Sequence, residues 1–179
     1  LRIVESPDGR FYAVVTAKWD HRNRIVISGG IYRRRPAGGI WEKLPLPADF
    51  VFPVSLTFSE DGKTLYSGCF RLWRERRRTG GGAYAEPGLW RFDADGGNAR
   101  KMLDGLPVYE ARPVPGRPAE LYCGTVGEGL FRSGDGGASW HSVLECPAGN
   151  IHTITFDPSR PTCLFVTTFG QGIWHGQID

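Results

Sequence analysis

The sequence predicts an all-β protein made of β-propeller blades, each a sheet of four antiparallel strands. Three observations predict this fold class. The chain repeats itself at a spacing of 43 residues, its apolar runs are short and rich in β-branched and aromatic residues, and Gly, Pro and Asp bound each run. No segment keeps a helical apolar stripe for more than one turn. Repeats of this length, each holding four short strands, are typical of propeller blades.

The repeat is clearest in the last two copies, which superimpose without a gap. Residues 125–131, Thr-Val-Gly-Glu-Gly-Leu-Phe, match residues 168–174, Thr-Phe-Gly-Gln-Gly-Ile-Trp, with only like-for-like changes. A third copy aligns through 65–68 and 88–91 with an insertion between these anchors, and the N-terminal stretch is a fourth. The approximate blades are 1–47, 48–106, 107–150 and 151–179, the last lacking its outer strand.

Apolar runs and turn dipeptides place the strands within each blade. Runs at 11–15, 65–70, 121–126 and 164–168 predict one strand in each of the four copies. Asp8-Gly9 and Asp61-Gly62 predict tight turns, because Gly supplies the positive φ that such turns need. For the third blade we expect strands at about 108–114, 119–126, 129–133 and 139–144.

Composition excludes several classes of protein. The 179 residues are 40% apolar with a net charge of +3, which fits one folded unit and gives no reason to expect nucleic-acid binding. No window approaches the roughly 18 apolar residues that a membrane span requires. The four cysteines form no CxxC pair, and we expect buried free thiols. The chain begins at Leu1 without a signal-peptide pattern or an initiator Met, so we expect a piece of something longer.

A specific motif lies in the third blade, 107–150. Ser133-Gly-Asp135-Gly-Gly137-Ala-Ser139-Trp140 matches the Asp-box, Ser/Thr-x-Asp-x-Gly-x-Thr/Ser-Trp, also called the bacterial neuraminidase repeat. The chain therefore resembles the propeller family of sialidases, xyloglucan-degrading glycosidases and sortilin-type receptors. The resemblance implies that Ser133, Asp135, Gly137 and Trp140 are structural residues on the rim away from the ligand, and it favours a secreted or periplasmic location.

The second blade keeps a decayed form of this motif at 93–100, without the Trp. An alternative interpretation is a calcium loop built from Asp93, Asp95, Asn98 and Asp104. Gly97 stands where a ligand is needed and Asn98 where the EF-hand pattern needs Gly, so we expect no metal here. The four histidines show no metal-ligand spacing, and we expect no cofactor.

The loops that join the second strand to the third, and the outer strand to the next blade, share one face of a propeller. The first set is 18–24, 70–87, 127–128 and 170–171, and the second is 45–53, 104–107 and 146–150. Arginine beside tryptophan suits carboxylates, phosphates or sugar rings. The candidate ligand-binding residues are Trp19, Asp20, His21, Arg22, Arg71, Trp73, Arg74, Arg76, Arg77, Arg78, Glu128 and Gln171. The alternative for the arginine-rich segment is a solvated loop without a ligand.

Catalysis is harder to assign. Carboxyl candidates on this face are Asp20, Glu86, Glu110 and Glu128, but nothing singles out the pair that a glycosidase needs. The Arg-Ile-Pro element of sialidase-like members is absent. We expect no catalytic residues, and a binding or scaffolding propeller whose loop face holds an anionic, glycan or protein ligand. The alternative is part of a secreted sialidase- or xyloglucanase-like glycoside hydrolase.

The number of blades predicts an incomplete propeller ring. Propellers of the resembled family have six to eight blades, whereas about four are present here. An open ring exposes apolar blade faces, which favours association. We therefore expect part of a larger ring, or a half that pairs with a second copy. His152 and Tyr109 begin the inner strands of their blades, where we expect both rings to pack beside the central channel.

Overall fold

The computed structural model describes residues 2–16, 18–20, 22, 25–27, 29–34, 39–50, 52–70 and 87–178. Its elements are all strands: β1 (Arg2–Glu5), β2 (Phe11–Val15), β3 (Lys18–Asp20), β4 (Ile25–Ile27), β5 (Gly30–Arg34), β6 (Trp41–Lys43), β7 (Thr57–Phe58), β8 (Thr64–Cys69), β9 (Gly88–Asp93), β10 (Arg100–Asp104), β11 (Val108–Val114), β12 (Arg117–Thr125), β13 (Leu130–Ser133), β14 (His141–Ser142), β15 (Ile151–Asp157), β16 (Arg160–Thr168) and β17 (Ile173–Gln177). Nothing in these ranges forms a helix long and apolar enough for a bilayer crossing.

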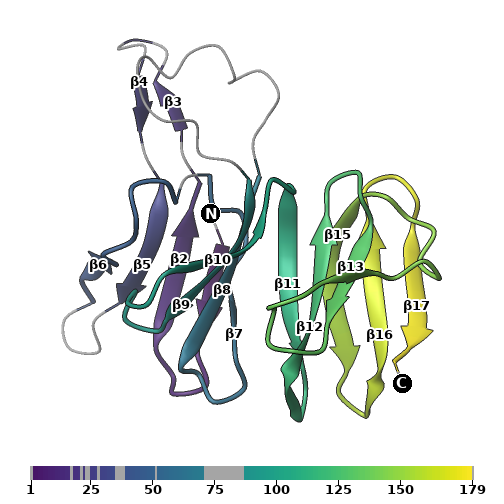
Figure 1. Ribbon diagram of the computed structural model, residues 1–179. Helices are drawn as coiled ribbons and strands as arrows, with labels where there is room; N and C mark the ends of the chain where they lie inside the picture. Colours follow the sequence, from purple (N-terminus) through teal and green to yellow (C-terminus); the bar gives the residue numbers. More distant parts are fainter. Residues whose placement is uncertain are drawn as a thin grey trace.

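The strands form four antiparallel sheets, here called blades 1 to 4 in chain order. Their strand orders are β1-β2-β5-β6, β7-β8-β9-β10, β11-β12-β13-β14 and β15-β16-β17. The sheets stand side by side, with β11 between blade 2 and the rest of blades 3 and 4 (Figure 1). This arrangement is that of β-propeller blades, as the repeats predict. The last sheet has three strands within the described residues, and β3 pairs with β4 in a separate hairpin.

The strand bounds differ from the expected ones where hydrogen-bonded pairing continues into polar sequence. β12 begins at Arg117 rather than near 119, because the tight turn at 115–116 pairs Val114 with Arg117. The outer strand β14 is shorter than expected and contains only His141 and Ser142. The hairpin of β3 and β4 interrupts a segment that the sequence presents only as a loop.

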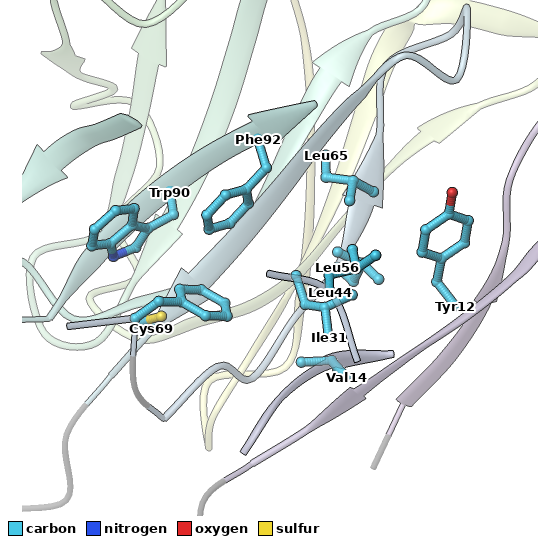
Figure 2. Packing of buried hydrophobic residues seen from close by; sticks show 10 residues of the cluster. Tyr12, Val14, Ile31, Leu44, Leu56, Leu65, Cys69, Trp90 and Phe92 are labelled. Carbon is cyan, nitrogen blue, oxygen red and sulfur yellow. The ribbon is translucent and has the colours of Figure 1, made fainter. Parts of the chain in front are cut away.

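Each contact between neighbouring blades is an apolar layer. Between blades 1 and 2 the layer contains Tyr12, Val14, Ile31, Leu44, Phe50, Leu56, Leu65, Cys69, Trp90 and Phe92 (Figure 2). Phe50 meets Phe92 edge to face with ring centroids 5.0 Å apart. A second layer around Leu121 joins blades 2 and 3, and a third around Ile154 joins blades 3 and 4. Burial of these side chains supplies the main stabilisation of the stack.

Two glycines allow the inner strand of the next blade to come close. A Cβ on Gly68 in β8 would lie 2.6 Å from the carbonyl oxygen of Val108, and one on Gly124 in β12 would lie 2.5 Å from Cγ2 of Ile151. Real Cβ atoms do not approach this closely. The missing side chains therefore set the distance from β8 to β11 and from β12 to β15.

The blades present two different ends. At one end, called the loop face, lie the second-to-third strand connections and the connections from each outer strand to the next blade. At the other end, called the turn rim, lie short turns between first and second strands and between third and fourth strands. Because successive strands run antiparallel, the turn at 126–129 and the turn at 134–140 lie at opposite ends of β13.

Candidate functional site

The loop face is held together by backbone hydrogen bonds between its two sets of connections. In blade 3 the amide of Val126 donates to Pro107 O at 2.9 Å, and the amides of Gly127 and Gly129 donate to Gly149 O. In blade 4 the amide of Phe169 donates to Asn150 O at 3.1 Å. These bonds hold one connection against the other. The backbone of the described part of the loop face therefore has a fixed position. The bonds also place the predicted loop sets of these blades on one side of the molecule.

Three aromatic rings lie in a row at the inner edge of this face. Phe70 directly follows β8, Tyr109 is the second residue of β11, and His152 is the second residue of β15. The ring centroids of Phe70 and Tyr109 are 4.8 Å apart, and those of Tyr109 and His152 are 5.1 Å apart. The row, here called the aromatic row, spans blades 2 to 4. The rings lie close together because Gly68 and Gly124 let the inner strands β11 and β15 approach the preceding blades.

The aromatic row includes exposed surface. His152 is exposed, whereas Tyr109 and Phe70 are half-buried. Phe169, also on the loop face, is 74% exposed. Flat ring faces at an accessible edge provide stacking surface for sugar rings, aromatic side chains or guanidinium groups.

A buried carboxylate follows Tyr109 along β11. Glu110 is fully buried, and its Oε1 lies 2.8 Å from Nη2 of Arg2 in blade 1 and 3.3 Å from Nη2 of Arg112. Its Oε2 accepts the amide hydrogen of Ile154 in blade 4 at 2.9 Å. Glu110 therefore joins three blades beneath the loop face. Because these partners occupy the carboxylate, we assign Glu110 a structural role and remove it from the carboxyl candidates.

Several predicted site residues fall where the structure gives little detail. Trp19 and Asp20 belong to β3, whose side chains are not described, and Arg22 is an exposed turn residue. The remaining predicted residues lie outside the described part of the chain: His21, Arg71, Trp73, Arg74, Arg76, Arg77, Arg78 and the carboxyl candidate Glu86. These residues remain predictions.

Glu128 and Gln171 occupy equivalent tight turns on the loop face. In blade 3 the hydroxyl of Thr125 donates to Gly129 O at 2.7 Å, and in blade 4 Thr168 donates to Gly172 O at 2.8 Å. Both Glu128 and Gln171 are exposed at these turns. The repeated threonine bond explains the local conformation, and it leaves both side chains accessible from the loop face.

On the turn rim, the 133–140 turn forms a closed network of hydrogen bonds. Oδ1 of Asp135 accepts the hydroxyl of Ser133 at 2.8 Å and the amide of Ser139 at 2.9 Å, and Oδ2 accepts the hydroxyl of Ser139 at 2.6 Å. The amide of Gly137 donates to Ser133 Oγ, and the indole of Trp140 donates to Gly137 O. These bonds, led by that of the Ser139 hydroxyl, hold the pKa of Asp135 well below its usual range.

The equivalent turn of blade 2 has a smaller network. Asp95 accepts the amide of Gly97 at 2.9 Å, and Asn98 donates its side-chain amide to Asp93. Asp104 pairs instead with Lys101. Within the described residues, no three His, Cys, Asp or Glu side chains gather as a metal site.

The repeat predicts that Tyr109 and His152 lie at the channel, but nothing in the sequence predicts their contact with Phe70. The contact arises between blades, and no local pattern reports it. The equivalent positions of Tyr109 and His152 in the repeat were the available signal. The cross-blade partner of Glu110, Arg2, had no signal in the sequence.

Comparisons with known proteins support the architecture. The sequence matches no protein-family model and no curated protein at a significant level. A structure of YCF48 bound to D1 peptide is 17% identical with a TM-score of 0.65, and it covers 99% of this chain and 49% of that one. The GH74 enzyme of Niastella koreensis is 17% identical with a TM-score of 0.68, covering 97% and 28%.

A gluconolactonase from Xanthomonas campestris is 20% identical, with a TM-score of 0.61 and coverage of 99% and 56%. The chain thus spans about half the length of that YCF48 structure, of a second one from Cyanidioschyzon merolae and of this enzyme, and less of the GH74 enzyme. At these identities the likeness concerns fold alone, since one fold hosts many functions. The chain has the architecture of β-propeller blades.

Proposed function

We propose that this chain is a non-catalytic binding or scaffolding module of the Asp-box type that holds its ligand on the loop face. The observation that carries the proposal is the aromatic row, Phe70, Tyr109 and His152, which crosses three blades at an accessible edge. The arginine-rich segment 71–78 directly follows Phe70 in the sequence. Aromatic faces next to guanidinium groups suit an acidic peptide or an acidic glycan.

Two further observations support a binding role. A structural neighbour, YCF48, is described as bound to a peptide. In addition, the Asp-box residues Ser133, Asp135, Gly137 and Trp140 direct their bonds to their own turn, so the motif needs no ligand to explain it. The turn rim thereby stabilises the blade, and ligand recognition belongs to the opposite end.

The test uses arrays of acidic peptides and acidic glycans with the 179-residue chain. We expect His152→Ala, and separately Arg74→Ala combined with Arg77→Ala, to weaken binding to the best array ligand by at least about tenfold. The matched control is Lys63→Ala combined with Arg160→Ala, which removes two exposed charges from the turn rim. Equal losses in the control and in the loop-face variants would overturn the proposal.

A glycoside hydrolase is the second candidate, because GH74 enzymes are among the structural neighbours. In this case Glu128, exposed on the loop face, is one described carboxylate that a substrate could reach there, and Asp20 and Glu86 are further candidates from the sequence. The test is turnover of chromogenic glycosides and xyloglucan. Hydrolysis that Glu128→Gln, Asp20→Asn or Glu86→Gln abolishes in a folded protein would replace the binding proposal by this one.

A further inference from the structure

The 133–140 turn of blade 3 contacts the outer strand of blade 2 through a methionine. Met102 in β10 is the single methionine of the chain, and its side chain is half-buried. A Cβ on Gly137 would lie 1.7 Å from Cε of Met102 and 3.4 Å from its sulfur. The methyl group of Met102 therefore occupies the space that a side chain at this buried glycine would need.

The same glycine is central to the hydrogen bonds of its turn. Its amide donates to Ser133 Oγ at 2.8 Å, and its carbonyl oxygen accepts the indole hydrogen of Trp140 at 3.2 Å. Met102 and Trp140 both pack against the apolar layer around Leu121 that joins blades 2 and 3. A displacement of Met102 would therefore disturb both the turn and the layer.

The equivalent contact between blades 1 and 2 uses aliphatic carbon atoms in place of a thioether. The matching turn of blade 2 approaches blade 1 at Gly96, where a Cβ would lie 3.1 Å from Cβ of Leu44 and 3.1 Å from Cδ of Pro45. Tyr12 adds a hydrogen bond from its hydroxyl to the carbonyl oxygen of Ala94 at 3.1 Å. Mild peroxide oxidises a thioether but leaves such groups unchanged. The two contacts therefore differ in their sensitivity to peroxide.

Oxidation changes the chemistry of the Met102 contact. Hydrogen peroxide transfers one oxygen atom to the thioether sulfur: an S–O bond forms, the O–O bond breaks, and water leaves. The sulfur loses two electrons and the peroxide gains them. The sulfoxide oxygen is polar and needs a hydrogen-bond donor or water. The groups that face the Met102 side chain here are the α-carbon of Gly137 and an apolar δ-carbon of Leu121, which supply neither.

We propose that Met102 is an oxidation-sensitive contact that holds the 133–140 turn against blade 2. Its sulfoxide releases this turn and loosens the junction between blades 2 and 3. Reduction of the sulfoxide by methionine sulfoxide reductases restores the contact. The contact belongs to the turn rim, so the proposal stands apart from the proposed ligand site on the loop face.

The experiment treats the 179-residue chain with hydrogen peroxide and locates the added oxygen by mass spectrometry of its peptides. We expect one added oxygen on Met102, a fall in Tm of at least about 4 °C, and amide exchange at least about tenfold faster at 133–140 and 100–104. Exchange at 94–97, in the turn of blade 2, is expected to stay unchanged. Treatment with methionine sulfoxide reductases for both sulfoxide epimers is expected to restore Tm and exchange.

Two variants separate Met102 from other oxidisable residues. Met102→Leu is the matched control, because leucine has a similar volume and no sulfur. It keeps all four cysteines and all six tryptophans, so a peroxide effect that persists in it comes from another residue. Met102→Gln places a polar group at the contact without an oxidant, and its Tm is expected to fall toward that of the oxidised chain.

Three results would overturn the proposal. In the first, Met102 is fully oxidised while Tm and exchange at 133–140 stay unchanged. In the second, peroxide lowers Tm equally in the wild-type chain and in Met102→Leu. In the third, Met102 resists peroxide until the whole chain unfolds, because the folded contact would then be closed to the oxidant.

Discussion

The two ends of the molecule use polar side chains in opposite ways. On the turn rim, Ser6 donates to Asp8, Ser59 donates to Asp61, and Asp157 accepts the amide of Ser159. These side chains complete the turns that hold neighbouring strands. On the loop face, Glu128 and Gln171 remain exposed, and the rings of the aromatic row border accessible surface.

The difference separates structural residues from candidate ligand-binding residues. A side chain whose hydrogen bonds are all made within its own turn contributes to stability. Its removal is expected to affect the stability of the fold more than ligand binding. A side chain that is positioned by the backbone but exposed is available to a ligand. By this criterion the most specific motif in the sequence, at 133–140, marks the end of the molecule where we do not expect the ligand.

The largest expected effect concerns Glu110, which supports the loop face from within. Glu110→Ala is expected to lower the free energy of unfolding by about 3 kcal/mol, because the Ile154 amide and the charges of Arg2 and Arg112 lose a buried partner. The arginines are each about one third exposed, which keeps the loss at the low end of the range for buried pairs. Urea denaturation measures it.

The control for that prediction is Glu120→Ala. Glu120 pairs with Arg132 at 3.0 Å at a more solvated site, and its loss is expected to cost about 1 kcal/mol or less. If both variants lose the same stability, Glu110 is not the inter-blade support described here.

A smaller effect is expected where blades 3 and 4 approach. Gly124→Ala places a Cβ 2.5 Å from Cγ2 of Ile151 and is expected to cost about 1 to 3 kcal/mol, as overpacking does in other cores. It should also weaken ligand binding, since this contact sets the spacing of Tyr109 and His152. Gly134→Ala on the turn rim meets nothing within 4 Å and is expected to change neither quantity. Thermal unfolding and array binding compare the two; equal behaviour would contradict the close-approach argument.

Acid should weaken the turn rim. The pKa values of Asp8, Asp61, Asp135 and Asp157 lie below their usual value of 3.8 because nearby hydroxyl and amide donors stabilise the charged form. A lowered folded-state pKa adds stability above the unfolded value, and this stability is lost as pH falls below it. Asp135→Ala is therefore expected to lower Tm by a few degrees at pH 7, with a difference from wild type that shrinks progressively below about pH 4.

Asp95→Ala is the matched variant in blade 2, where fewer turn bonds are made, and its effect on Tm should be smaller. A Tm difference for Asp135→Ala that grows toward acid pH would show that the carboxylate is not stabilised in its charged form.

The smallest effect is a difference in thiol reactivity. Cys146, in the connection that leads to the loop face, is half-buried, whereas Cys69 and Cys123 are buried and their thiol pKa values are raised by desolvation. A thiol reagent at pH 8 is expected to modify Cys146 first, and to reach the other two only with global unfolding. Mass spectrometry locates the label. Early modification of Cys123 would contradict the tight packing of blades 2 and 3.

Much of the fold was predictable because each blade repeats the same local sequence pattern. The 43-residue spacing, the apolar runs and the turn glycines located the blades and most strands. Pairing across polar residues, as in the N-terminal half of β12, was not predictable because apolar pattern does not report backbone hydrogen bonds.

The candidate site was less predictable. The repeat identified Tyr109 and His152 as equivalent, but their contact with Phe70 depends on two glycines in other strands. The ion pair of Glu110 with Arg2 joins two residues that are far apart in the sequence, and no local sequence pattern predicts it. The contacts of the aromatic row and the ion pair of Glu110 with Arg2 both depend on packing between blades, which the sequence pattern within one blade does not predict.

The most direct test of loop-face recognition is an amide-exchange footprint of the best array ligand on the 179-residue chain. Slower exchange is expected at 105–109, 126–129, 146–152 and 169–172, with no change at the turn-rim segments 6–10, 59–64 and 134–140. Protection confined to those turn-rim segments would contradict the account and place recognition at the opposite end.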